Sequence, residues 1–262
     1  MKRVKCTIAY DGSNFSGFQI QPNKRTVQGE LEKALAKMHQ GKKVRLHASG
    51  RTDAGVHAVG QVFHFDTALT LPPHKWKRAL QSLLPKDIQV MLTENAEEDF
   101  HARFSAIEKE YRYFVLNRPE PNIFRRQYIY HSPNKYDLEQ MQQACRVFEG
   151  THDFTTFASA KSTAKGSKVR TLSEVNCNKQ GDIIEFVLRG NGFLQHMVRI
   201  IVGALLETGT GMRTPIELAE ILAKQDRRYA GKTIPSEGLY LWKVSYDKQP
   251  EQPSIKVNNN DL

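Results

Sequence analysis

Hydrophobic and polar residues alternate over residues 3–10, so that Val4, Cys6 and Ile8 share one side of an extended chain. A period of two predicts a half-buried β-strand. Similar runs predict strands at 44–48, 59–66 and 88–92. Between these runs the apolar spacing becomes helical, first after Thr26, a typical N-cap residue, and again from Trp76 to Leu84, before Pro85. The first part of the chain therefore predicts the order β-α-β-β-α-β.

The second part of the chain repeats this order without recognisable sequence identity to the first. Strands are predicted at 107–116, 170–177, 182–189 and 238–246, and helices at 138–148 and 193–208. A further short helix is expected from Thr214-Pro215-Ile216-Glu217 to Lys224, since this tetrapeptide combines an N-cap, an N1 proline and a capping-box glutamate.

Two successive βαββαβ runs predict an α+β fold built from two RRM-like (ferredoxin-like) halves. We expect one domain at 1–105, which carries Asp53, and a second at 106–247, with a disordered tail at 248–262. Their antiparallel sheets are expected to lie side by side and form a cleft.

The composition of the 262-residue chain is that of an ordinary globular protein, with 39% hydrophobic and 25% charged residues. No apolar run approaches the roughly 20 residues that span a bilayer, and the N-terminus lacks a signal-peptide core. We therefore expect a cytoplasmic protein without membrane contact. The three cysteines, Cys6, Cys145 and Cys177, are far apart and show no metal-binding spacing, so they are expected to be buried thiols.

The net charge of +10 indicates a polyanionic partner, and its distribution favours nucleic acid. Two windows contain basic residues but no acidic ones. The first runs from Lys33 to Thr52, and the second from Phe154 to Ser173. The second is rich in Gly, Ser, Thr and Ala, which predicts a mobile loop. The second window holds Lys161, Lys165, Lys168 and Arg170, which we expect to contact phosphates. With such loops along one face, the cleft between the two sheets is expected to be a basic RNA-binding cleft.

The stretch SGRTDAGVH, residues 49–57, follows the first basic window and contains Asp53. Asp-Ala-Gly is common turn chemistry, because Asp bonds its own backbone and Gly supplies a positive φ. On these residues alone, Asp53 is either a turn residue or a reactive carboxylate. His57 and His64 lie nearby in sequence, but no third ligand stands at standard spacing, so no metal site is predicted.

Five separated blocks resemble the tRNA pseudouridine synthases of the A type. They span about residues 3 to 246 in order, and one small departure is Phe18, where the family often has Trp. The blocks are YDGSNFSGFQIQP with TVQGELEKAL, SGRTDAGVHA, Lys109-Glu110-Tyr111-Arg112-Tyr113, Gly192-Phe193-Leu194 with Met197-Val198-Arg199, and Gly238-Leu239-Tyr240-Leu241.

The resemblance implies that Asp53 is the nucleophile of a cofactor-free and metal-free conversion of uridine to pseudouridine. A carboxylate nucleophile divides the isomerisation into easier steps, by attack either at C6 of the base or at C1′ of the ribose. It must be ionised, which the guanidinium of Arg199 would favour. An arginine among the apolar residues of 193–208 fits this role, because a buried arginine needs an anion.

Further roles follow from the same resemblance. Tyr111 would stack on the flipped uracil and assist proton transfer, Leu241 would pack against the base, and Arg51 would bind phosphate or hold the target nucleotide out of its helix. The expected substrate is the anticodon stem-loop of tRNA, at positions 38–40, and the expected assembly is a homodimer.

The residues also allow two alternative hypotheses about the function. A non-catalytic protein with tandem RRM-like sheets is the stronger one, since Phe63 and Phe65 faintly resemble the stacking aromatics of an RNP1 strand. Such a protein has no use for the anion Asp53 in its RNA groove. A metal-dependent nuclease would need clustered carboxylates or histidines, which the sequence lacks.

Overall fold

The computed structural model describes residues 1–160 and 166–246, and the chain divides into two compact units. Unit 1 comprises Met1–Ile107 and the described residues from Tyr240 onward, whereas unit 2 comprises Glu108–Leu239. The closing strand, which the sequence predicts for the second half, is thus counted with unit 1. Lys161, Lys165 and the tail predicted at 248–262 lie outside the described residues.

Unit 1 contains a mostly antiparallel sheet with the strand order β4-β1-β3. Strand β2 pairs antiparallel with one end of β3, and β10 pairs parallel with the other end through His57 and Ala58. The elements are β1 (Lys2–Tyr10), α1 (Val27–Met38), β2 (Leu46–Ala48), β3 (His57–Thr67), α2 (Pro73–Leu83), β4 (Ile88–Ala96) and β10 (Leu239–Tyr246).

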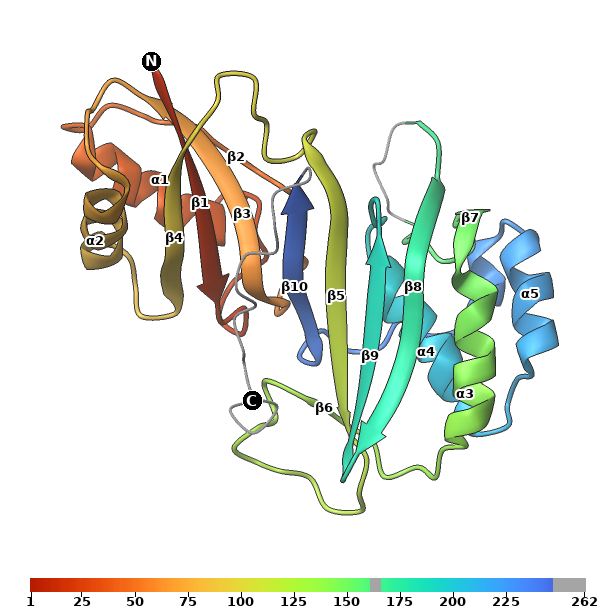
Figure 1. Cartoon of the computed structure of the whole chain (residues 1–262). Helices are drawn as coiled ribbons and strands as arrows, with labels where there is room; N and C mark the ends of the chain where they lie inside the picture. Colours follow the sequence, from red (N-terminus) through yellow and green to blue (C-terminus); the bar gives the residue numbers. More distant parts are fainter. Residues whose placement is uncertain (161–165, 247–262) are drawn as a thin grey trace. The chain divides into compact units, whose positions relative to one another are not determined.

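Helices α1 and α2 cover one face of this sheet (Figure 1). The ring of Trp76 on α2 packs edge-on against Phe65 of β3, with 5.2 Å between ring centroids. On β1, the predicted alternation appears as buried Val4, Cys6 and Ile8. Full burial of such side chains contributes about 1.5–3 kcal/mol each, so this face forms the core of unit 1.

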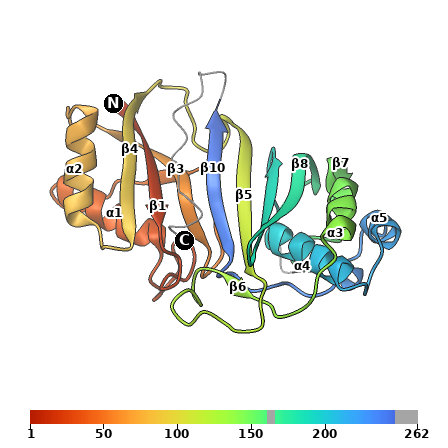
Figure 2. The ribbon, with the colours of Figure 1, turned by 60° about the horizontal axis from the view of Figure 1, so that its bottom comes forward.

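In unit 2 the strands follow the antiparallel order β5-β9-β8-β7, and the short strand β6 runs parallel to β5. Helices α3 and α4 lie on one face of these strands (Figure 2). The elements are β5 (Ala106–Leu116), β6 (Tyr130–His131), α3 (Leu138–Cys145), the 3₁₀ helix η1 (Arg146–Phe148), β7 (Gly150–Asp153), β8 (Val169–Gln180), β9 (Ile183–Gly190), α4 (Met197–Gly209), α5 (Pro215–Ala223) and the 3₁₀ helix η2 (Arg227–Tyr229).

The helix ends follow the predicted capping chemistry at two places and depart from it at one. Thr26 Oγ1 accepts a hydrogen bond from Gly29 N at 3.2 Å, and Thr214 forms a capping box with Glu217. Helix α4, predicted from residue 193, begins only at Met197, so that boundary was wrong. The reason is His196, whose φ of 63° is left-handed and interrupts the helical backbone directly before Met197.

The α+β class is confirmed, since mostly antiparallel strands combine with a few helices. Cys6, Cys145 and Cys177 are buried and free, as predicted. Among the described residues, no helix is both long and apolar enough to cross a membrane.

Candidate active site

Asp53 lies on a tight turn in the loop between β2 and β3 of unit 1. Its carbonyl oxygen accepts a hydrogen bond from Val56 N at 3.2 Å, and Gly55, the third residue of the turn, has a φ of 76°. A positive φ at this position is what a type II turn requires, and glycine adopts it without strain. The turn chemistry predicted for SGRTDAGVH is therefore present, and it leaves the Asp53 side chain half-exposed.

A second segment, residues 10–18, packs backbone against backbone on this turn. Gly55 N donates to Phe15 O at 3.4 Å, and Phe18 N donates to Thr52 O at 3.1 Å. Glycine is needed at residue 17, where φ is 92° and an added Cβ would lie 2.9 Å from Thr52 O. The Asp53 turn is thus held from outside as well as by its own hydrogen bonds.

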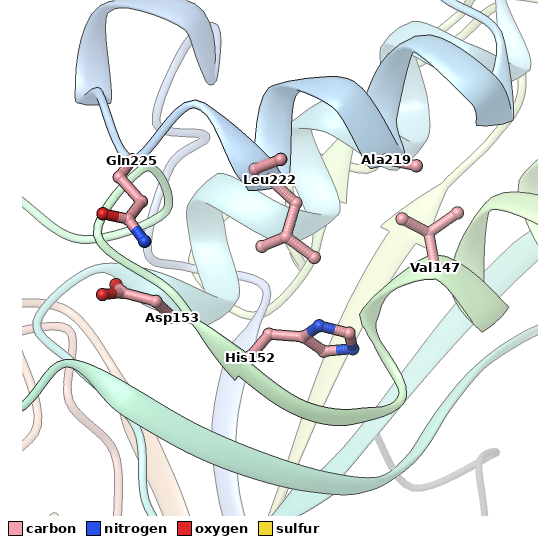
Figure 3. Close-up of a pocket in the computed structure, with 7 residues that line it drawn as sticks. Val147, His152, Asp153, Ala219, Leu222 and Gln225 are labelled. Atoms are coloured by element: carbon pink, nitrogen blue, oxygen red, sulfur yellow. The ribbon is translucent and has the colours of Figure 1, made fainter.

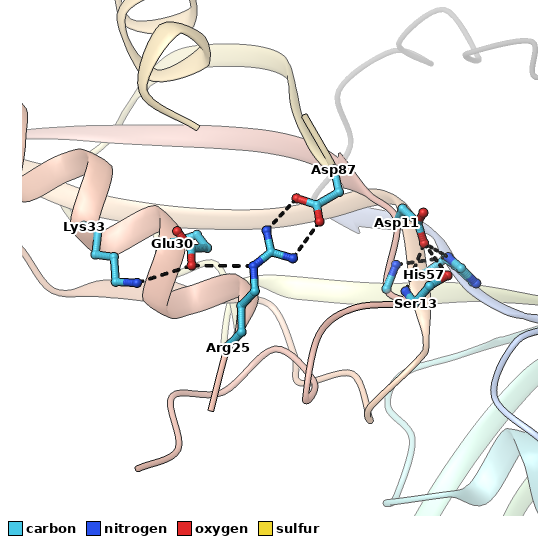
Figure 4. Close-up of polar contacts among 8 residues, drawn as sticks. Asp11, Ser13, Arg25, Glu30, Lys33, His57 and Asp87 are labelled. Atoms are coloured by element: carbon cyan, nitrogen blue, oxygen red, sulfur yellow. Dashed lines mark hydrogen bonds and ion pairs between the residues drawn. The ribbon is translucent and has the colours of Figure 1, made fainter. Parts of the chain in front are cut away.

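Asp11, in the same segment, joins this packing to the start of β3 (Figure 4). Its Oδ1 accepts from the backbone N of Ser13 at 2.9 Å and from the Ser13 hydroxyl at 2.6 Å, and lies 3.3 Å from Nδ1 of His57. His57 is buried, and its ring stacks on Tyr240 of β10 at 4.7 Å between centroids.

Leu241 follows Tyr240, and the register of β10 on β3 places it beside Ala58. It is completely buried. The structure therefore brings Leu241 close to the end of the Asp53 loop, although the two are far apart in sequence.

Tyr111 lies on β5 of unit 2 and is almost buried, with 8% of its surface exposed. Its ring meets Phe193 edge-on, with 5.0 Å between centroids. Phe193 belongs to the Gly-Phe-Leu stretch before α4, so two of the predicted blocks meet here.

Arg199 lies near the start of α4 and is half-buried. Its Nε donates to Ile234 O at 2.7 Å, and the hydroxyl of Tyr113 donates to the neighbouring Pro235 O at 2.9 Å. Both side chains thus hold the segment that leads to β10. Arg199 belongs to unit 2 and Asp53 to unit 1, and their pairing stays a prediction.

The basic residues predicted to contact RNA are accessible where the structure describes them. Arg51 is exposed, and its Nε donates to Gln19 Oε1 at 3.0 Å. Lys168 and Arg170 are half-exposed, and Arg170 also donates to the carbonyl of Ser167 at 3.0 Å. Their side chains therefore have room to reach a phosphate.

The RNP1-like interpretation of β3 is wrong. Phe63 and Phe65 are both 0% exposed, because they face the helices of unit 1. They cannot stack on bases, as RNP1 aromatics do. Among residues 1–160 and 166–246, no group of three His, Cys, Asp or Glu side chains is arranged to hold a metal ion.

Comparison with known proteins identifies the family. A family model described as tRNA pseudouridine synthase matches residues 7–105 and 144–247. The chain belongs to the tRNA pseudouridine synthase family. The tRNA pseudouridine synthase A of Oceanobacillus iheyensis is 58% identical over 248 residues, covering 95% of this chain and 98% of that protein.

Two further family members are similar over nearly their whole length. The tRNA pseudouridine synthase A of Geobacillus kaustophilus is 54% identical, covering 95% of this chain and 96% of its own. The tRNA pseudouridine synthase A 1 of Bacillus cereus is 53% identical, covering 94% and 100%. A chain in a crystal structure of a Cbf5-Nop10-Gar1 complex gives a TM-score of 0.32 at 13% identity, covering 78% of this chain and 54% of that one.

In this tRNA pseudouridine synthase, the sequence indicated the Asp53 loop but not most of the contacts that hold it. It indicated no role for Tyr10, Gln61 or Asp11, because their contacts with residues 49–57 are formed only in the folded chain. Gly12 and Gly17 are the sequence features that could have indicated these contacts, since glycine allows two backbone segments to approach closely.

This tRNA pseudouridine synthase has a pocket that none of these residues lines. It has a volume of about 280 Å³ and lies in unit 2 between α5 and the η1–β7 region (Figure 3). Val147, His152, Ala219 and Leu222 are among the residues that line it. None of the predicted catalytic residues contributes to its wall.

Proposed function

We propose that this tRNA pseudouridine synthase acts on uridines of the anticodon arm, at positions 38–40, with Asp53 as its nucleophile. The observation that carries the proposal is that Asp53, a partly exposed residue, lies on a turn fixed by Gly55 and by residues 10–18. A group held in one position on a rigid scaffold is what nucleophilic catalysis requires. The family and the relatives' names support the substrate class.

The chemistry needs no atom from outside the substrate. The N1–C1′ bond breaks, the base turns, C5 bonds to C1′, and the proton lost from C5 is balanced by the proton gained at N1. The carboxylate of Asp53 forms a covalent intermediate and is released at the end. Attack at C6 and attack at C1′ both lead to this product, and the proposal covers both.

Three further side chains are assigned to the reaction on the basis of the family motifs. Tyr111 stacks on the flipped uracil and assists proton transfer, which fits its largely buried ring beside Phe193. Arg199 pairs with Asp53 and keeps it ionised. Leu241 packs against the base.

The tRNA backbone is bound by basic side chains. Arg51 lies two residues before Asp53, and Lys168 and Arg170 come from unit 2, as part of the window that also contains Lys161 and Lys165. The window from Lys33 to Thr52, which precedes Asp53 in the sequence, contains six basic residues. All six are exposed: Lys33, Lys37, Lys42, Lys43, Arg45 and Arg51. Contacts of this kind offset the few kcal/mol that base flipping costs.

We further propose that both halves have the RRM-like plan, that the protein is cytoplasmic and that it forms a homodimer. In unit 1, the element order β1-α1-β2-β3-α2-β4 and the neighbours β4-β1-β3-β2 support the RRM-like plan. Sedimentation of the purified protein tests the homodimer.

Mapping pseudouridine in tRNA from cells that lack this protein tests the proposed function. We expect pseudouridine to disappear at positions 38–40 and to return when the wild-type chain, but not Asp53→Asn, is supplied. An unchanged modification pattern at these positions would contradict the assignment.

A further inference from the structure

A buried hydroxyl pair fixes the residue directly before Asp53. The hydroxyl oxygen of Tyr10, at the end of β1, lies 2.8 Å from Oγ1 of Thr52. Both residues are buried, with 5% and 7% of their surfaces exposed. A hydroxyl in the core is unfavourable unless it is hydrogen-bonded, so this pair ties the loop to the strand rather than only filling space.

Gln61, on β3, holds the beginning of the same loop. Its Nε2 donates to Gly50 O at 3.0 Å, and its Oε1 accepts from the hydroxyl of Ser49 at 2.7 Å. Gln61 and Ser49 are both 0% exposed. A buried polar network with these partners gives its members one defined geometry.

The two anchors are joined through Tyr10. Burial raises the pKa of Tyr10 to about 12, while hydrogen bonds with Thr52 and Gln61 oppose that rise. Tyr10 is therefore protonated at neutral pH. The side chains of Tyr10, Thr52, Gln61 and Ser49 form one cluster beneath the loop, which we name the loop anchor.

The segment that follows Tyr10 is itself fixed at its far end (Figure 4). Arg25 makes two hydrogen bonds to Asp87, at 2.7 and 2.9 Å, and its guanidinium lies 4.1 Å from the ring centroid of Phe15. Arg25 O also accepts from Ser16 N at 2.8 Å. The Asp53 turn therefore lies between the loop anchor and a backbone segment that is held in place.

We propose that Tyr10, Thr52 and Gln61 are positioning residues for the isomerisation, which hold the Asp53 carboxylate where it meets the uridine. The proposal rests on the proposed function, because it takes Asp53 as the nucleophile. The three residues act through the backbone of residues 50–53. Their loss should slow the chemical step while leaving tRNA binding intact.

Tyr10→Phe tests the proposal, since it removes the hydroxyl and keeps the ring. We expect the single-turnover rate of label release from C5 of tRNA uridine to fall about 10- to 100-fold, because a displacement of about 1 Å can cost 10²-fold in rate. The Kd for tRNA should change less than about twofold.

Tyr246→Phe is the matched control. The Tyr246 hydroxyl is partly buried within unit 1, and it donates to Ala102 O at 2.7 Å, away from the Asp53 loop. We expect this variant to react at the wild-type rate. Comparing the thermal unfolding midpoints of both variants shows how much each hydroxyl contributes to stability alone.

Substitutions at Thr52 separate the hydroxyl from side-chain shape. Thr52→Ser keeps the hydroxyl and should keep most of the rate, whereas Thr52→Val keeps the shape and should lose as much as Tyr10→Phe. The double variant Tyr10→Phe/Thr52→Val should be no slower than the slower single variant, because both changes remove one shared interaction.

A wild-type single-turnover rate in folded Tyr10→Phe and Thr52→Val would overturn the proposal, as would an equal loss in Tyr246→Phe. If Tyr10→Phe does not fold, the comparison of Thr52→Ser with Thr52→Val decides alone. Failure of the proposed function looks different: the wild-type protein would release no label, or Asp53→Asn would release it at the wild-type rate.

Discussion

A Cβ atom at residue 12 would lie 2.1 Å from the carbonyl oxygen of Val56, so Gly12 and Val56 meet backbone against backbone. Gly12→Ala must therefore displace the Asp53 turn or its own segment. We expect a loss of about 2–3 kcal/mol in the free energy of unfolding, measured by urea denaturation, together with slower pseudouridine formation.

Gly41→Ala provides the comparison for this prediction. Gly41 has a φ of 85°, but nothing lies within 4 Å of an added Cβ. Its substitution costs only the left-handed backbone, about 1–2 kcal/mol, and should leave the rate unchanged. Equal activity of the two variants would show that the contact between Gly12 and Val56 does not bear on the Asp53 turn.

Arg199→Met should keep the fold but depress turnover by at least tenfold. Methionine fits the apolar surroundings of α4, but it lacks the charge proposed to keep Asp53 ionised and the hydrogen bond to Ile234 O. The surface substitution Arg228→Met, at a side chain that is 85% exposed, is the control for lost charge. A wild-type single-turnover rate in Arg199→Met would show that the proposed pairing is wrong.

Lys168→Ala combined with Arg170→Ala should weaken tRNA binding without changing the single-turnover rate at saturating enzyme. Each lost phosphate contact reduces the slope of log K against log salt by about 1. Filter binding from 50 to 200 mM salt measures both the affinity and the slope. An unchanged slope would show that Lys168 and Arg170 do not contact tRNA phosphates.

Acid should destabilise the protein through His64. Burial lowers the pKa of His64 to about 4, and the neighbouring charges of His101 and Arg3 act in the same direction. Its Nδ1 accepts a hydrogen bond from Ala102 N at 3.1 Å, which the neutral ring allows and a proton on Nδ1 would break.

The folded protein therefore favours neutral His64, whereas the unfolded chain protonates it near pH 6.5. The resulting stabilisation is fully present above about pH 6.5 and is lost as the pH falls toward 4. We expect a loss on the order of 2–3 kcal/mol from this residue. Urea denaturation of wild type and His64→Gln from pH 7.5 to 4.5 should show a shallower pH dependence in the variant, and parallel curves would refute the assignment.

Local signals in the sequence predicted most elements of the fold. The alternation in β1 and the caps at Thr26 and Thr214 lie within a few residues of the structure they specify. The start of α4 was missed because His196 takes a left-handed backbone that its sequence does not announce. Strand β7 was missed because four residues are too short to show a period.

The candidate site was likewise predictable only where its features are local in sequence. Asp53 stands in a recognisable stretch, so its turn was predictable, including the positive φ of Gly55. The pairing of β10 with β3, which brings Leu241 beside Ala58, joins residues from opposite ends of the chain. The hydrogen bond between Tyr10 and Thr52 likewise depends on the packing of β1 against β3. No local pattern predicts such contacts.

We propose Asp53 as the nucleophile of this tRNA pseudouridine synthase. The most direct measurement is the release of label from C5 of uridine in tRNA by wild type and Asp53→Asn, with filter binding of the same tRNA. We expect release by wild type, none above background by Asp53→Asn, and similar tRNA affinity for both. Release at the wild-type rate by Asp53→Asn would show that Asp53 is not the nucleophile.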